Sequence, residues 1–241
     1  MWFALSLSLL IVAYNNVVNR WTPFHGAAYV PINLVFTGVV TVVAATTLEL
    51  SRAELGLEFG NREAGFSFIT VAVFGFAAFT IARSRHAHRI ADRRVAGLRG
   101  LGLIYYVMVR IPLGTALAEE VLFRGVLFAV WRDVGISSLN AALFASFAFG
   151  LWHVSPTILG IRINDPHASG QQLWAAVAGA VLFTTIAGLG LTWLRLRTGG
   201  LLAPIVLHGG INSVSAVAAV RAARAGGSDP RNAPDGSISE V

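Results

Sequence analysis

The sequence predicts an all-α fold, a bundle of helices that crosses a membrane several times. Hydrophobic residues make up 55% of the 241 positions. Charged residues make up only 12%, against about 25% in soluble domains. The mean hydropathy is +0.67, and the apolar residues gather in long segments separated by short polar connectors. Because a membrane-crossing helix needs about 20 such residues, we expect a polytopic transmembrane helix bundle.

Seven apolar segments approach or exceed the length of one crossing. The first has no basic region and no cleavage site, so we expect it to be a retained helix. The fourth is longer than one crossing requires, and a break at Pro112 and Gly114 would divide it and give eight spans. We therefore expect seven or eight spans. The segments are 2–18, 27–47, 64–82, 101–130, 137–153, 173–194 and 201–220.

The connectors indicate orientation and domain limits. Residues 83–100 carry six arginines and one aspartate, which predicts a cytoplasmic connector that faces anionic lipid. Residues 48–63 alternate acids, arginines and apolar residues, which predicts a short amphipathic helix on the membrane surface. After residue 220 the composition becomes small and polar. We expect one membrane-embedded helical domain at 1–220 and a disordered tail at 221–241.

Composition also limits the function classes. The formal net charge is +6, and the chain contains neither lysine nor cysteine. The excess arginine lies in connectors and tail, where membrane topology explains it, so we expect no nucleic-acid partner. The absence of cysteine excludes a thiol nucleophile, thiolate metal ligands and disulfides. Basic residues that are all arginine are typical of GC-rich genomes, so we expect the cytoplasmic membrane of a prokaryote.

Three charged residues, Glu119, Glu120 and Arg124, lie inside the apolar stretch 111–130. Each central charge would cost roughly 2.5 to 3.5 kcal/mol if it faced lipid. Glu120 and Arg124 are four apart on one helix face and are expected to form an ion pair. Glu119 then points about 100° away, where it can face a cavity and act as a base. A purely structural ion pair would leave Glu119 without a partner.

Two histidine motifs lie in later segments. Phe149 and His153 are four apart near the end of the fifth segment, where Pro156 breaks the helix and lets His153 meet water. His208 and Asn212 are four apart in a glycine-rich run that permits close helix approach. Two donors side by side suit an oxyanion. Either motif alone is also compatible with ordinary hydrogen bonding between membrane helices.

The coincidence of the three motifs favours a functional site. Nearly every strongly polar group well inside a predicted span belongs to one of them, and Arg110 is the main exception. The other histidines lie in connectors, and every aspartate lies in a connector or the tail. We therefore predict a site assembled from three helices.

In this order on successive apolar segments, the motifs resemble those of the CPBP intramembrane proteases. This family contains the type II CAAX prenyl endopeptidases and Abi-like proteins of bacteriocin processing or immunity. The motifs are Glu-Glu-x-x-x-Arg at 119–124, Phe-x-x-x-His at 149–153 and His-x-x-x-Asn at 208–212. The run Ala-Glu-Glu-Val-Leu-Phe-Arg-Gly at 118–125 is especially typical. The resemblance covers about 101–220.

The resemblance implies an endopeptidase that hydrolyses a peptide bond of a membrane-associated peptide or protein. It implies that Glu119 and His153 activate a water, and that His208 and Asn212 stabilise the tetrahedral oxyanion. Hydrolysis of a peptide needs these parts, a base and preorganised donors. The supporting residues would be Glu120, Arg124 and Phe149.

Members of the family have been described both as zinc proteases and as metal-free proteases of the glutamate type. A zinc site would use His153, His208 and Glu119 and keep one open position. Asn212 is a poor zinc ligand and a good oxyanion donor. We therefore favour catalysis without a cofactor and keep zinc as the alternative.

Other function classes explain the sequence less well. The chain has no His-Glu-x-x-His, no aspartate in a span and no Gly-x-Ser-x-Gly run, so other intramembrane protease types are not indicated. A proton-coupled transporter also buries ionisable groups, but the inverted repeats typical of transporters are not visible. A catalytically silent scaffold or immunity protein would keep the same fold. The intact motifs favour the enzyme.

Overall fold

The computed structural model describes residues 1–18, 26, 28–58, 64–84, 86–87 and 90–225, without the side chains of 64–69. These residues are 83% helical and contain no strand, which confirms the all-α prediction. The helices are α1 (Trp2–Val18), α2 (Tyr29–Leu48), α3 (Ala64–Ala82), α4 (Arg93–Ala96), α5 (Gly100–Tyr105), η3 (Tyr106–Leu117), α6 (Ala118–Glu120), η4 (Val121–Leu127), α7 (Phe128–Asp133), α8 (Ser138–Trp152), α9 (Val154–Asn164), α10 (Gly170–Thr198) and α11 (Leu202–Ala225).

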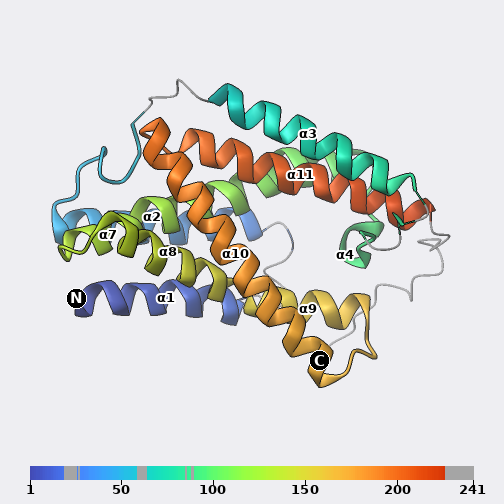
Figure 1. Ribbon diagram of the computed structural model, residues 1–241, viewed down its shortest axis with the longest axis horizontal. Coiled ribbons are helices and arrows are strands. Elements are labelled where there is room, and N and C mark those ends of the chain that lie inside the picture. The colour runs from blue at the N-terminus through green and yellow to red at the C-terminus, as the bar shows by residue number, and fades with distance from the viewer. Residues whose placement is uncertain (19–25, 27, 59–63, 85, 88–89, 226–241) are drawn as a thin grey trace.

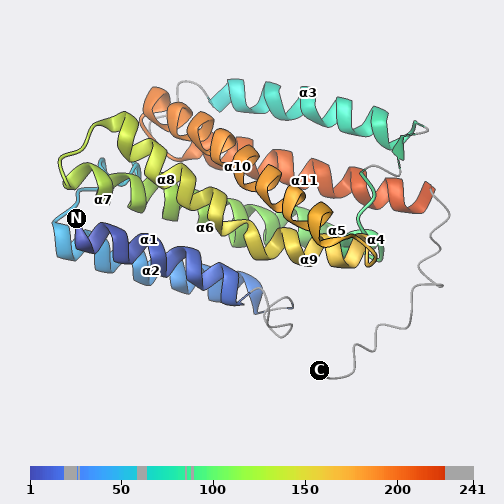
Figure 2. The ribbon, with the colours of Figure 1, turned by 60° about the horizontal axis from the view of Figure 1, so that its bottom comes forward.

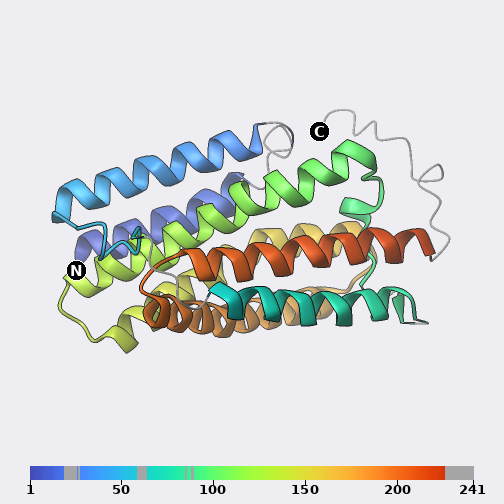
Figure 3. The same ribbon diagram turned by 90° about the horizontal axis from the view of Figure 1, so that it is seen from above.

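The long helices lie side by side in an elongated bundle (Figure 1). α11 packs along α3 for most of its length, as Figure 3 shows from above. α10 crosses α8 and α9 and contacts both. Figure 2 shows α8 passing into α9 along one side of the bundle. The continuous helical run from α5 to α7 contacts α2, α8 and α11, so it lies at the centre.

Among the described residues, five helical runs are long and apolar enough to cross a membrane. They are Tyr29–Leu48, Gly100–Asp133, Ser138–Asn164, Gly170–Thr198 and Leu202–Ala225. Two further apolar helices are shorter, Trp2–Val17 and Thr70–Ala82. The chain is therefore an integral membrane protein, and the predicted count of seven or eight spans is not confirmed.

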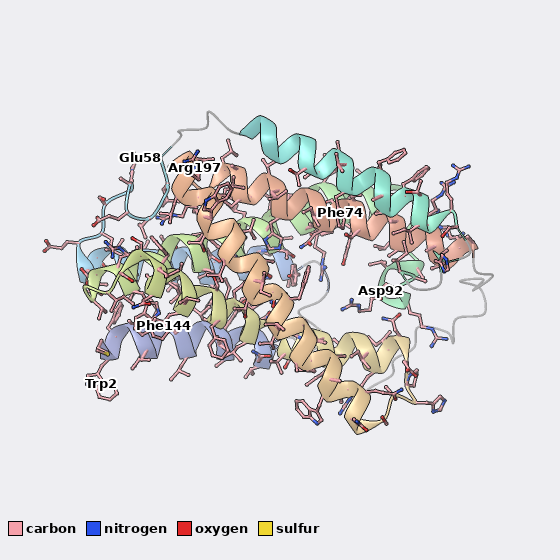
Figure 4. The ribbon with its side chains drawn as sticks, viewed as in Figure 1. Trp2, Glu58, Phe74, Asp92, Phe144 and Arg197 are labelled. Atoms are coloured by element: carbon pink, nitrogen blue, oxygen red, sulfur yellow. The ribbon has the colours of Figure 1, made fainter. Side chains whose placement is uncertain are left out.

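Large apolar side chains are exposed on the surface, and the charged motif Glu119, Glu120 and Arg124 of the central run is buried, as expected of a bundle in lipid. Trp2 is 83% exposed and projects from α1 (Figure 4). Phe183 on α10 is 72% exposed. In contrast, Glu120 is 0% and Arg124 1% exposed. The bundle therefore presents hydrocarbon outward and encloses this charged motif.

The expected break at Pro112 is wrong, because helical hydrogen bonding continues from Gly100 to Asp133. η3 has the π-helical pattern, in which the missing N–H of Pro112 would have bonded Val107 O. The Ser213 hydroxyl of α11 donates to that oxygen instead, at 2.8 Å. A donor from a neighbouring helix thus satisfies the carbonyl that proline leaves free.

The expected amphipathic helix at 48–63 is also wrong for its described part, since residues 49–58 form turns. Glu49 ends α2 in the left-handed conformation, with φ 53°. Ser51 and Glu54 then close a single turn, because the Ser51 N–H and hydroxyl both donate to Glu54 Oε2. Gly56 ends this turn at φ 67°. Residues 59–63 lie outside the described residues.

Close helix contacts depend on small residues. A Cβ on Gly150 of α8 would lie 2.8 Å from the Val181 carbonyl oxygen of α10. A Cβ on Gly209 would lie 3.2 Å from Ala116, and one on Gly210 would lie 2.5 Å from Val71. The glycine-rich run beside His208 therefore lets α11 pack between η3 and α3. α11 continues to Ala225, so the disordered tail predicted at 221–241 is wrong for residues 221–225, and residues 226–241 lie outside the described residues.

Candidate functional site

Glu119 and Glu120 lie on α6, a three-residue α-helical step between the π-helical segments η3 and η4. Both side chains are buried, with 5% and 0% exposure. Because consecutive helical residues point about 100° apart, the two carboxylates face different neighbours. Glu119 faces α8 and Glu120 faces α11.

Glu120 and Arg124 form the ion pair that their spacing predicts. Arg124 Nη1 donates to Glu120 Oε1 at 3.0 Å, and both side chains are fully buried. The Arg124 guanidinium also stacks on Phe149 of α8, 4.0 Å from the ring centroid. Phe149 therefore has a structural role beside the charge, because a guanidinium held over an aromatic face is stabilised by the ring.

His208 of α11 contacts both carboxylates. Its Nδ1 lies 2.7 Å from Glu120 Oε1, and its Nε2 lies 3.8 Å from Glu119 Oε2. Since an ionised carboxylate only accepts, the short contact requires a proton on Nδ1. Nε2 of His208 is then the atom turned toward Glu119, and it donates only when the ring is an imidazolium.

Glu119 has a partner that its motif did not predict. Trp152 of α8 donates its indole N–H to Glu119 Oε1 at 3.0 Å. The other oxygen, Oε2, is buried and has no hydrogen-bond partner within the described part of the chain. One oxygen is therefore held in place while the other is free to accept a proton. The signal in the sequence was a tryptophan beside His153, whose N–H needs an acceptor when buried.

His153 lies at the junction of α8 and α9. Its Nδ1 lies 2.7 Å from the Phe149 carbonyl oxygen, so Nδ1 carries the proton and Nε2 is an acceptor in the neutral ring. His153 lies near enough to Glu119 and His208 to interact with both electrostatically. The structure thus brings the charged motif and both histidines together.

Asn212 is not joined to this cluster. No hydrogen bond links it to the other candidate residues among those the structure describes. It lines a cavity of about 470 Å³ between α3, α11 and η3, together with Thr115 and mainly apolar side chains. Asn212 lies one turn from His208 on α11, but neither carboxylate and neither histidine of the cluster is among the residues that line this cavity.

Arg110, the exception to the three-motif pattern, packs against the faces of two aromatic rings. Its guanidinium lies 3.9 Å from the ring centroid of Tyr29 and 5.0 Å from that of Tyr106. The Tyr29 hydroxyl contacts the Thr115 hydroxyl at 3.0 Å. Arg110 therefore belongs to a structural contact between α2 and η3, apart from the cluster.

The residues named for a zinc site do not form a ligand set here. His208 uses Nδ1 for Glu120, and His153 uses Nδ1 for a backbone carbonyl. Glu119 uses one oxygen for the indole of Trp152. Among the described residues, no group of three or more His, Cys, Asp or Glu side chains could hold a metal ion. Zinc-ligating histidines also donate their other ring N–H to a carboxylate or carbonyl, so these hydrogen bonds leave both Nε2 atoms available.

Comparison with known proteins identifies the central segment. A family model described as type II CAAX prenyl endopeptidase Rce1-like matches residues 100–214. That range runs from the start of α5 into α11 and includes every candidate site residue. No curated protein and no solved structure matches the chain.

Proposed function

We propose that the chain hydrolyses a peptide bond of a membrane-associated peptide or protein, and its match to the Rce1-like family model of type II CAAX prenyl endopeptidases over residues 100–214 supports this. The proposal rests mainly on how the two carboxylate oxygens of Glu119 are hydrogen-bonded. Its Oε1 is held by Trp152, and its buried Oε2 accepts no hydrogen bond within the described part of the chain. An oriented carboxylate with one free oxygen is the arrangement that a general base requires.

In this proposal Glu119 accepts the proton of the attacking water, and His153 assists through Nε2. Both groups border the same cluster, and the Nδ1 contact to Phe149 O directs the lone pair of His153 away from the backbone. Water attacks the scissile carbonyl carbon, and the proton on Glu119 then passes to the leaving amine. The peptide C–N bond breaks as that nitrogen is protonated.

His208 and Asn212 stabilise the negative charge on the carbonyl oxygen. Glu120 is the counter-ion that permits His208 to donate through Nε2 while Nδ1 is engaged. Asn212 offers an amide N–H at the wall of the cavity. Each preorganised donor typically contributes about 2.7 to 4 kcal/mol to an oxyanion.

We propose that this hydrolysis needs no bound metal, because Asn212 is a poor zinc ligand and a good oxyanion donor. Cleavage that persists after exhaustive chelation supports this step. Loss of cleavage on chelation, followed by recovery with added zinc, contradicts it.

The function is tested by comparing membrane-protein termini in cells that express the wild type or Glu119→Gln. The substitution removes the base and keeps the shape of the side chain. Glu58→Gln, at an exposed position, is the control with the same chemical change. Termini that require Glu119 but not Glu58, at equal protein levels, establish proteolysis and identify substrates.

Indistinguishable termini at matched levels would contradict the proposal and favour a silent scaffold or immunity protein. The location in the cytoplasmic membrane of a prokaryote is part of the same proposal. It rests on the arginine-rich connector at 83–100 and on the arginine-only basic composition. Fractionation of the expressing cells tests it directly.

A further inference from the structure

The helix that carries His153 is interrupted beside the candidate site. α8 ends at Trp152, α9 begins at Val154, and His153 between them has φ −87° and ψ 2°. Pro156 follows in the first turn of α9 and has no N–H. The N–H of residue 156 would otherwise bond the Trp152 carbonyl, so proline leaves that carbonyl without its helical donor.

Two asparagines of α1 form hydrogen bonds with the backbone at this interruption. Asn15 Nδ2 donates to the Trp152 carbonyl oxygen at 2.7 Å, a buried hydrogen bond. Asn15 thus supplies the donor that Pro156 lacks. The link joins α1 to α8 across a separation of 137 residues.

Asn16 replaces a second helical hydrogen bond. In an uninterrupted helix the Ser155 N–H would donate to Leu151 O. Instead the Ser155 N–H donates to Asn16 Oδ1 at 2.8 Å, and Asn16 Nδ2 donates to Leu151 O at 3.0 Å. The Ser155 hydroxyl also donates to the Asn16 carbonyl at 2.9 Å. The asparagine amide therefore lies between the two backbone groups and satisfies both.

The hydrogen bond to the carbonyl that Pro156 leaves free resembles the one at Pro112, where Ser213 donates to Val107 O. The two differ in where the donor comes from. Ser213 lies within the family-matched segment 100–214, whereas Asn15 and Asn16 lie outside it. Membrane helices tolerate proline where a neighbouring side chain satisfies the free backbone groups. In this chain the asparagines of α1 form hydrogen bonds with those free backbone groups beside His153.

The repaired backbone carries two groups of the candidate site. Trp152, whose carbonyl Asn15 binds, donates its indole N–H to Glu119. The next residue is His153. A change in the backbone between α8 and α9 would therefore move two groups at once, the indole N–H that holds Glu119 and the imidazole of His153. Displacements of about 1 Å at such groups can lower rates by about a hundredfold.

We infer that Asn15 and Asn16 are positioning residues, which hold the α8–α9 interruption in the geometry that aligns Trp152 and His153 with Glu119. Neutral amides suit this role, since they satisfy a donor and an acceptor within the membrane without bringing a charge. The inference rests on the proposed function for its effect on cleavage. Its effect on structure is measured separately.

The test is a double-mutant cycle between Asn15 and Pro156. Asn15→Leu removes the donor and keeps the number and branching of the side-chain heavy atoms, and Pro156→Ala returns a backbone N–H that can bond Trp152 O. Asn140→Leu, an exposed position in the first turn of α8, is the matched control. Each variant is assayed with a substrate peptide taken from the comparison of termini, and its thermal unfolding in detergent is recorded.

We expect Asn15→Leu to lower kcat about tenfold or more with KM changed less than about twofold, because groups are misaligned while the cavity is kept. In the Pro156→Ala background the same change should alter kcat by less than about twofold. A purely packing role for Asn15 predicts equal losses in both backgrounds and would overturn the inference. Asn140→Leu should match the wild type.

The side-chain nitrogen resonances of His153, recorded without substrate, give a readout independent of cleavage. We expect Asn15→Leu to shift these resonances from their wild-type values. In the double variant, Asn15→Leu with Pro156→Ala, they should lie close to the values of Pro156→Ala alone. If wild-type protein cleaves nothing while this cycle holds, the proposed function fails and the positioning inference stands. If the resonances are unchanged by Asn15→Leu in either background, the inference is wrong.

Discussion

Arg124 and His208 converge on a single oxygen of Glu120. Arg124 Nη1 lies 3.0 Å from Oε1, and His208 Nδ1 lies 2.7 Å from the same atom. The carboxylate therefore joins the central helical run to α11. Arg124 is fixed in turn by Phe149 of α8. One buried anion thus ties together the three helices that carry the predicted motifs.

Arg124→Met is predicted to destabilise the protein by about 3 to 5 kcal/mol, because it leaves Glu120 buried without its counter-charge. Arg124→Lys should fall between the wild type and Arg124→Met, since lysine keeps the charge but not the planar contact with Phe149. Thermal unfolding in detergent measures both. Equal stability of Arg124→Met and the wild type would show that His208 alone compensates Glu120.

Gly188→Ala tests how tightly Arg124 is enclosed. A Cβ at Gly188 would lie 3.0 Å from Arg124 Nη2 and 3.0 Å from Ser146 Cβ. We expect a loss of about 1 to 3 kcal/mol from this overpacking. Gly190→Ala on the same helix is the control, because a Cβ there meets nothing within 4 Å. Equal effects of the two substitutions would contradict the enclosure.

Trp152→Phe removes the N–H that holds Glu119 Oε1 and keeps an aromatic ring. Loss of one neutral donor should lower kcat about 3- to 10-fold, with KM little changed. Trp131→Phe is the control, since the Trp131 indole N–H donates to the Ser8 hydroxyl, 3.2 Å away. Both variants lose an indole hydrogen bond, and only Trp152→Phe should lose activity. A parallel loss in Trp131→Phe would point to a general effect on stability.

The lowered pKa of Asp92 predicts an acid-sensitive contact outside the bundle core. Burial opposes ionisation of this carboxyl most strongly, but hydrogen bonds from Arg94 and Asn164 outweigh it and lower the pKa of Asp92 below 3.8. Asp92 caps α4, and Asn164 ends α9, so the contact holds these helices together (Figure 4). A lowered pKa stabilises the folded state above the unfolded value, and the stabilisation is lost as pH falls through the folded value.

Hydrogen exchange at residues 90–98, corrected for intrinsic rates, should therefore accelerate below about pH 3.8 relative to higher pH. Asp92→Asn should show reduced protection at every pH and a weaker pH dependence. Asp165→Asn, an exposed aspartate at the end of α9, should follow the wild type. Acid-insensitive exchange in the wild type would contradict the role given to Asp92.

The sequence was sufficient for features that repeat along one helix. Apolar runs predicted the all-α class, and the spacing of Glu120 and Arg124 predicted their ion pair, because residues four apart share a face. Paired glycines predicted the close approach of α11. Each depends on neighbours in the chain and leaves a local pattern.

Contacts between a side chain and a distant backbone group leave no such pattern. The donors from Ser213 to Val107 O and from Asn15 to Trp152 O decide whether a proline breaks a membrane helix, and neither has a fixed spacing. For this reason the break expected at Pro112 was wrong. A useful signal was still present. When one apolar helix contains a proline and another contains a polar side chain, a hydrogen bond from that side chain to the carbonyl left free by proline is to be expected.

The chain order of the cluster has a consequence for biosynthesis. Glu120 and Arg124 enter the bilayer on one helix and can neutralise each other at once. His208 arrives only with α11, after α8 and α10 have been made. Until then the carboxylate of Glu119 has no histidine from α11 beside it. A nascent chain held at the translocon therefore lacks the complete cluster until α11 has been made.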